Sequence, residues 1–160
     1  MIQDYQMLFV CTGNTCRSPM AEALWRQLTA GKAESCGVSA WSGAEAAANA
    51  VAAVGRYGAD LSAHRARDLA EVTTEPDWVV TMTKDQARRV VALRPEWGDR
   101  VFTLSELAGE DGDIRDPVGQ DLAQYEKVAD EIYRLLVKVK ERLEHGDIQP
   151  PQGPESSPEG

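Results

Sequence analysis

Three cysteines and two histidines are few for a chain of 160 residues, and they limit the kinds of site that it can hold. Three cysteines cannot form the disulfide framework of a small secreted protein, so we expect a reducing, cytoplasmic environment. The two histidines lie far apart, and no cysteines or carboxylates accompany them at metal-ligand spacing. A zinc site is therefore excluded.

Long hydrophobic runs and an excess of positive charge are missing as well. No apolar stretch approaches the roughly 20 residues that cross a membrane, and residues 1–5 lack the basic lead and long apolar stretch of a signal peptide. The 17 Lys and Arg face 26 Asp and Glu, which gives a net charge of −9. We therefore expect neither a membrane nor a nucleic acid as partner, and an anionic ligand must be attracted by local positive groups.

The length and the 42 % hydrophobic content fit one globular domain with a single core, which we place at residues 1–145. The remaining segment, residues 146–160, carries four prolines among polar side chains. Such a segment has too little apolar surface to offset its ordering entropy, so we predict a disordered tail.

Four apolar runs alternate with helical patterns along the chain. Strands are predicted at residues 7–10, 33–41, 78–82 and 101–104. Helices are predicted from residue 19 onward, at 46–57, from Ser62 to about residue 72, at 84–91 and at 122–143. This alternation predicts an α/β fold, a three-layer doubly wound sheet of four parallel strands with helices on both faces. Binding sites in such sheets lie at the carboxyl ends of the strands.

Several other features have a structural interpretation. The apolar stripe along residues 122–143 indicates core packing rather than a partner-binding face, and Cys36 is interpreted as a packed thiol. His64 is interpreted as a hydrogen-bonded turn residue, with a general base or a metal ligand as alternatives. The acidic run at 105–121 reads as a solvated loop. Asp116 differs from its neighbours, because the proline after it restrains its backbone to an extended conformation.

The stretch from Cys11 to Ser18 lies between a predicted strand and a predicted helix whose first turn suits Pro19. Several backbone N–H groups of such a loop point at one spot, and the helix dipole adds partial positive charge, so the loop is suited to an anion. Arg17 offers a planar fork for two phosphate oxygens. It should favour the thiolate of Cys11, whose sulfur the Ser18 hydroxyl can hydrogen-bond. The alternative is a buried strand-end cysteine beside an unrelated surface arginine.

Residues 9–22, with the sequence FVCTGNTCRSPMAE, resemble the signature of the low-molecular-weight protein tyrosine phosphatase family. The resemblance is closest to the branch that includes bacterial protein arginine phosphatases. Segments related to this family also occur at residues 35–38, 61–67, 79–83 and 116–117. The resemblance therefore extends over about residues 7–143.

This resemblance implies a cysteine-dependent protein phosphatase that works through a phosphocysteine and needs no cofactor. Cys11 would attack phosphorus, Arg17 would hold the phosphoryl oxygens, and Asp116 would protonate the leaving group and then activate water. Asn14 would brace the loop, because its side chain suits a left-handed backbone. The other loop residues expected around the phosphate are Thr12, Gly13, Thr15, Cys16 and Ser18. The expected partner is a phosphorylated protein, and the expected state is a monomer.

The choice of substrate depends on three positions. Tyrosine-specific members usually carry a branched apolar residue where this chain has Thr15, whereas arginine phosphatases carry threonine. The family's tyrosine-directed members also tend to have an aromatic residue after the Asp-Pro pair, and here that place is Val118. Trp41 falls where many of them have an aromatic pocket wall, but a tryptophan face can stack on a guanidinium as well as on a phenol. Phosphoarginine is therefore favoured, phosphotyrosine is the alternative, and Trp41 is either a pocket residue or a partly exposed hydrophobe.

Three further possibilities remain at the level of sequence. An arsenate reductase on this scaffold would need further cysteines, and a phosphate-binding module without catalysis would typically have lost Cys11 or Asp116. The resemblance also implies reversible oxidation through Cys16, which lies five residues after Cys11. The alternative for Cys16 is a small packed residue facing the first helix.

Overall fold

The computed structural model describes residues 1–151. Its four strands are β1 (Gln6–Cys11), β2 (Lys32–Gly37), β3 (Trp78–Thr81) and β4 (Val101–Thr103). All pairs are parallel, and the strand order is β2-β1-β3-β4. The predicted four-stranded parallel sheet is thereby confirmed. The order places β1 inside the sheet, with its carboxyl end between β2 and β3.

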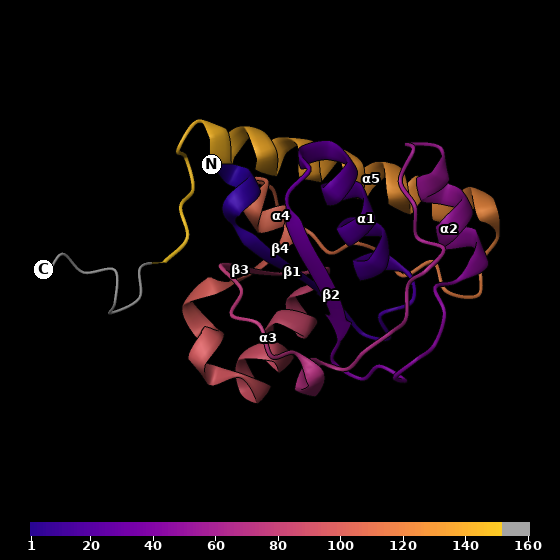
Figure 1. The fold of residues 1–160 in the computed structure, drawn as a ribbon, viewed down its shortest axis with the longest axis horizontal. Coiled ribbons are helices and arrows are strands. Elements are labelled where there is room, and N and C mark those ends of the chain that lie inside the picture. The colour runs from indigo at the N-terminus through magenta and orange to yellow at the C-terminus, as the bar shows by residue number, and fades with distance from the viewer. Residues whose placement is uncertain (152–160) are drawn as a thin grey trace, which may run out of the picture.

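Helices cover both faces of this sheet (Figure 1). One layer contains α1 (Arg17–Thr29), α2 (Ala48–Gly55), α4 (Leu104–Leu107) and α5 (Leu122–Glu144), which pack on one another. The opposite face carries α3 (Lys84–Leu93) with the 3-10 turns at Leu69–Glu71 and Pro95–Arg100. A further 3-10 turn, Ile2–Asp4, precedes β1 and contacts α5. The three-layer α/β architecture predicted from the sequence is therefore confirmed.

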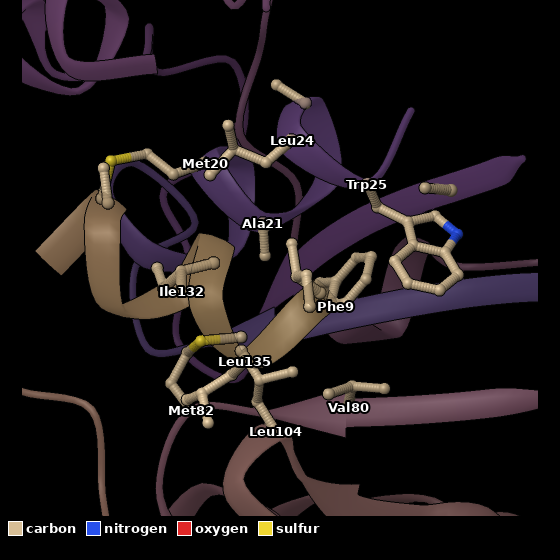
Figure 2. Packing of buried hydrophobic residues seen from close by; sticks show 14 of the residues in the cluster. Phe9, Met20, Ala21, Leu24, Trp25, Val80, Met82, Leu104, Ile132 and Leu135 are labelled. Carbon is tan, nitrogen blue, oxygen red and sulfur yellow. The ribbon is translucent and has the colours of Figure 1, made fainter. Parts of the chain in front are cut away.

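The core is divided by the alternation of side chains along β1. Phe9 points into the larger cluster between the sheet and the α1–α5 layer, whereas Leu8 and Val10 face the cluster under α3. Figure 2 shows Phe9 among side chains of α1 and α5. The buried residues of α5 are Tyr125, Val128, Ala129, Ile132, Leu135, Leu136, Val139 and Leu143. The predicted apolar stripe is thus core, except that Leu122 at the helix start is 40 % exposed.

The predicted helix from Ser62 to residue 72 is wrong. Only the 3-10 turn at its end forms, with Asp68 as its N-cap. The backbone before this turn is used in tertiary hydrogen bonds instead: the N–H of Ala66 donates to the carbonyl of Ala44 at 2.7 Å, and that of Arg67 to the Asn14 side chain at 3.0 Å. These bonds replace the i to i−4 bonds that a helix would need.

Several predicted boundaries also shift. The strand predicted at 33–41 ends at Gly37, and the helix predicted from residue 46 begins at Ala48. The strand predicted to reach residue 104 ends at Thr103, because Thr103 and Glu106 form a capping box that starts α4.

The predicted tail lies mostly outside the part of the chain that the structure describes. Residues 146–151 belong to no helix or strand. Residues 152–160 are outside the described residues, so both the disorder of the tail and the domain boundary at residue 145 stay predictions. Within the described range, no helix has the length and the apolar character to cross a membrane.

Candidate active site

The loop between β1 and α1 lies at the carboxyl end of an interior strand. Cys11 is the last residue of β1 and is 3 % exposed, and Cys16 is the N-cap of α1. Among residues 1–151, no protein group accepts a hydrogen bond from the backbone N–H groups of residues 13–16. Free N–H groups at a helix N-terminus are suited to an anion, because the helix dipole adds partial positive charge.

Asn14 holds the loop from the inside. It is fully buried and has a left-handed backbone, with φ 58°. Its Nδ2 donates to Ser18 Oγ and to Ser35 Oγ, both at 2.9 Å, and its Oδ1 accepts the N–H of Arg67 at 3.0 Å. The ring of His64 donates from Nε2 to the Asn14 carbonyl at 2.8 Å. His64 is thus a hydrogen-bonded turn residue that supports the loop.

Ser18 is arranged to hydrogen-bond the Cys11 sulfur. The two atoms, Cys11 Sγ and Ser18 Oγ, are 2.9 Å apart. The Ser18 oxygen already accepts from Asn14, so its hydroxyl proton is left for the sulfur or for the Cys36 carbonyl at 3.3 Å. When Cys11 is a thiolate it has no proton to donate, and the hydroxyl must then be the donor in the shorter contact.

Arg17 connects the loop to the segment that carries Asp116. Its guanidinium is buried, and Nη1 donates to the carbonyl of Ile114 at 2.8 Å. Nη2 lies 3.6 Å from Asp116 Oδ2, a carboxylate whose side chain is 44 % exposed. The N–H of Ile114 donates to the carbonyl of Met82 after β3 at 2.9 Å. One end of the guanidinium is therefore anchored on protein, while Nη2 faces the acid above the loop.

The remaining predicted site residues have different surroundings. Thr15 is half-buried, and its carbonyl accepts the N–H of Ala47 at 3.0 Å. Cys16 is buried in the core cluster that includes residues of α1, and its thiol lies 3.3 Å from the hydroxyl of Tyr125 on α5. Burial raises the pKa of the Cys16 thiol. Trp41 is 85 % exposed, and within residues 1–151 its ring makes no aromatic contact.

Sequence reasoning missed the groups that support the loop from behind. Ser35 on β2 is 4 % exposed, accepts from Asn14 and donates to Glu22 Oε1 at 2.6 Å. Glu22 in turn pairs with Arg26 at 2.9 Å. A serine inside a buried strand was the available signal, because a buried hydroxyl needs partners. No group of three or more His, Cys, Asp or Glu among residues 1–151 could hold a metal ion.

Gly37 at the end of β2 permits the close approach of the loop. A Cβ atom at this position would lie 2.4 Å from the Thr12 carbonyl oxygen and 3.1 Å from the Asn14 nitrogen. Both neighbours are backbone atoms, so they cannot move aside without displacing the loop.

We therefore expect Gly37→Ala to destabilise the protein by about 1–3 kcal/mol, the usual range for overpacking, and to lower the catalytic activity that the resemblance implies. Gly55→Ala is the matched control, because a Cβ there meets nothing within 4 Å, and alanine favours a helix by about 0.5–1 kcal/mol. Thermal unfolding and kcat/KM of both variants test this. Equal behaviour of the two would show that Gly37 does not set the loop position.

Comparison with known proteins agrees with the family resemblance seen in the sequence. The family model described as low molecular weight phosphotyrosine protein phosphatase matches residues 6–147. A protein-arginine-phosphatase of Geobacillus stearothermophilus is 40 % identical over 146 residues, which cover 88 % of this chain and 97 % of that protein. A low molecular weight protein tyrosine phosphatase from T. tengcongensis has a solved structure with a TM-score of 0.81 and 40 % identity, covering 87 % of this chain and 99 % of that one.

A second solved structure is a variant of an arginine phosphatase in which a serine replaces a cysteine and the active-site serine is phosphorylated. It has a TM-score of 0.82 and 34 % identity, and the match covers 87 % of this chain and 95 % of that one. Both the family match and the coverage extend over almost all described residues. The chain is therefore a protein phosphatase of the low molecular weight phosphotyrosine protein phosphatase family.

Proposed function

We propose that this phosphatase hydrolyses phosphoarginine in proteins, with Cys11 as nucleophile, Arg17 as phosphoryl-binding cation and Asp116 as acid and base. The observation that carries the proposal is the placement of these three residues at one end of the sheet. Cys11 and Arg17 close the same loop, and Arg17 Nη2 lies 3.6 Å from Asp116 Oδ2. Phosphoryl transfer needs such positioning and charge stabilisation more than it needs other reactive groups.

The first step forms the phosphoenzyme. The phosphoryl oxygens bind to the N–H groups of residues 13–16 and to Arg17, which stabilise the charge that develops on them. The Cys11 thiolate attacks phosphorus, the S–P bond forms, and the P–N bond to the arginine side chain breaks. Asp116 donates its proton to the departing nitrogen, so the arginine leaves as a neutral or cationic guanidine and Asp116 becomes a carboxylate.

The second step returns the enzyme to its starting state. The Asp116 carboxylate takes a proton from a water molecule, whose oxygen attacks phosphorus, and the P–S bond breaks. Inorganic phosphate leaves, and Cys11 departs as a thiolate. The Ser18 hydroxyl, 2.9 Å from the sulfur, stabilises the charge on this leaving group.

Support for phosphoarginine comes from two positions at the mouth of the loop. The family resemblance associates a threonine at the Thr15 position with arginine phosphatases, and the protein-arginine-phosphatase described above is 40 % identical to this chain. Val118, 61 % exposed after Asp116-Pro117, replaces the aromatic residue expected of tyrosine-directed members. Trp41 is compatible with either substrate, because its exposed face can stack on a guanidinium or on a phenol.

The test is a side-by-side measurement of kcat/KM on matched phosphoarginine and phosphotyrosine peptides. A higher value on phosphoarginine supports the proposal, and a higher value on phosphotyrosine replaces it with the tyrosine phosphatase alternative. Thiol-dependent arsenate reduction is disfavoured, because Cys36 is fully buried and burial raises its pKa to about 12. Such a thiol is a poor relay for electrons.

We expect Thr15→Ile to lower kcat/KM on the phosphoarginine peptide by roughly tenfold, while turnover of the phosphotyrosine peptide is retained or improved. The branched apolar side chain would crowd the planar guanidinium and its attacking water, but would offer packing surface to an aromatic ring. The ratio of the two kcat/KM values is the measurement. An unchanged ratio would remove Thr15 as the selector.

The setting proposed for this activity is a reducing cytoplasm and a monomeric enzyme. All three cysteines are free thiols, which supports a reducing environment. Size-exclusion chromatography with light scattering tests the oligomeric state.

Reversible oxidation is a further part of this proposal. Peroxide would convert the Cys11 thiolate to a sulfenic acid, and the Cys16 thiol would then displace water to form a Cys11–Cys16 disulfide. Because burial raises the pKa of Cys16, the thiolate fraction of Cys16 grows as pH rises toward that pKa. Disulfide formation should therefore accelerate with increasing pH.

We expect peroxide to inactivate the enzyme and dithiothreitol to restore it, with the disulfide detected by mass spectrometry in between. Cys16→Ser should lose the recovery, measured as a fraction of the activity of the same variant before oxidation. Cys36→Ala is the control, since Cys36 is fully buried. Equal recovery in Cys16→Ser, with no disulfide in the wild type, would leave Cys16 as a packing residue.

A further inference from the structure

Gln86 is an almost fully buried polar residue in the first turn of α3, 3 % exposed. Its Oε1 accepts the backbone N–H groups of Met82 at 3.0 Å and of Thr83 at 3.1 Å. Two N–H donors that face one atom require that atom to be the oxygen, so the orientation of the amide is fixed. The Nε2 of Gln86 must therefore point the other way, where it donates to Thr12 Oγ1 at 3.1 Å.

This contact determines what the Thr12 hydroxyl can do. Thr12 directly follows Cys11, and its side chain is on the exposed side of the loop. Because its oxygen accepts a hydrogen bond from Gln86 Nε2, its own proton points away from Gln86. In the part of the chain that the structure describes, no protein group accepts that proton. The hydroxyl proton is thus directed away from Gln86, on the residue that precedes the free N–H groups of residues 13–16 in the chain.

We propose that Gln86 is a positioning residue that orients the Thr12 hydroxyl as a hydrogen-bond donor to a phosphoryl oxygen of the bound substrate. This proposal rests on the proposed function, because a phosphoryl group held by the loop is what places an oxygen next to Thr12. Gln86 does not touch the substrate. It acts through Thr12, and its two bonds to Met82 and Thr83 hold it rigidly at the end of β3.

The donor itself is tested by two substitutions at Thr12. Thr12→Val keeps the shape of the side chain and removes the hydroxyl, whereas Thr12→Ser keeps the hydroxyl. The readouts are kcat/KM for para-nitrophenyl phosphate and the inhibition constant of inorganic phosphate. We expect Thr12→Val to weaken both by roughly tenfold, the effect of one hydrogen bond to a charged group. Thr12→Ser is expected to lose less than about threefold.

The positioning role is tested by Gln86→Glu. This variant keeps an oxygen for the N–H groups of Met82 and Thr83, but it replaces the Nε2 donor with an acceptor. The Thr12 hydroxyl then donates to Glu at position 86 and is turned away from the substrate. A buried carboxylate also repels phosphate directly, and that repulsion persists when Thr12 is Val. The loss caused by Gln86→Glu should therefore be larger in the wild type than in Thr12→Val, by roughly the tenfold effect of the hydroxyl.

Gln86→Met, measured in the wild type and in Thr12→Val, repeats this double-mutant cycle without adding a charge. Thermal unfolding of each variant identifies those that are not folded. The proposal is overturned if Thr12→Val retains the phosphate affinity and kcat/KM of the wild type. It is also overturned if the Gln86 substitutions reduce both quantities by the same factor in the two backgrounds. Phosphate affinity measured by calorimetry separates the two proposals. A wild type that binds phosphate but hydrolyses no phosphorylated substrate contradicts the proposed function. In that case the phosphate affinities of the Thr12 and Gln86 single and double variants still decide the positioning role.

Discussion

Cys11→Ser is expected to lower turnover of para-nitrophenyl phosphate by at least about 10⁴-fold, while phosphate still binds. A serine hydroxyl is a far weaker nucleophile than a cysteine thiolate, and its phosphate ester is slow to hydrolyse. The N–H groups of residues 13–16 and Arg17 are unchanged by the substitution, so the anion site persists. Steady-state kinetics measure the loss, and calorimetry with inorganic phosphate measures binding.

The same variant offers a direct view of the intermediate. With a phosphoarginine peptide, Cys11→Ser is expected to accumulate a phosphoserine at position 11, which intact-protein mass spectrometry detects as one added phosphoryl group. Cys36→Ala is the control for cysteine loss, because Cys36 is fully buried in the cluster under α3 and lies outside the loop. Near wild-type turnover by Cys11→Ser would mean that water attacks phosphorus directly and that no phosphocysteine forms.

Asp116→Asn is expected to slow the hydrolysis of substrates with poor leaving groups by about 10²–10⁴-fold, the usual contribution of a general acid. Para-nitrophenol leaves readily without a proton, so para-nitrophenyl phosphate should be affected much less in the step that forms the phosphoenzyme. Burst kinetics on a series of aryl phosphates measure the dependence of this step on the pKa of the leaving group. The dependence should be steep in Asp116→Asn and shallow in the wild type.

Asp113→Asn is the matched control for this experiment. Asp113 lies three residues before Asp116 on the same segment, but its carboxylate accepts the N–H of Lys84 at the start of α3, at 3.0 Å. It should therefore affect stability more than leaving-group dependence. If Asp113→Asn steepened the dependence and Asp116→Asn did not, Asp113 would be the acid.

The parts of the site that could be predicted from the sequence are those whose structure depends on residues adjacent in the chain. The strand before Cys11, the loop, and the helix with Pro19 in its first turn form one continuous local pattern, so their arrangement follows from the chain itself. The alternation of strands and helices gives the parallel sheet in the same way. The strand order and the residues behind the loop, such as Ser35 and Gln86, depend on contacts between distant segments.

The helix that was wrongly predicted after Ser62 is also explained by contacts between distant segments. The segment after Ser62 has side chains compatible with a helix, but its backbone N–H groups donate to Asn14 and Ala44, and these tertiary bonds decide its conformation. The boundary between β4 and α4 was mispredicted for another reason. The capping box of Thr103 and Glu106 is a local sequence signal, but the apolar run at 101–104 favours a strand that continues through residue 104. The segment that carries Asp116 is held near Arg17 by Ile114, whose carbonyl accepts from Arg17 Nη1 and whose side chain is buried in the core. Both are contacts between distant segments.

The left-handed Asn14 has a consequence for the energetics of binding. A left-handed conformation costs a non-glycine residue about 1–2 kcal/mol, and here the side-chain bonds to Ser18, Ser35 and Arg67 compensate for it. The loop is therefore ordered by the folding of the protein and not by the arrival of the phosphoryl group. Because binding then needs to freeze little backbone motion, most of the interaction energy between the loop and the phosphoryl group remains available to stabilise the transition state.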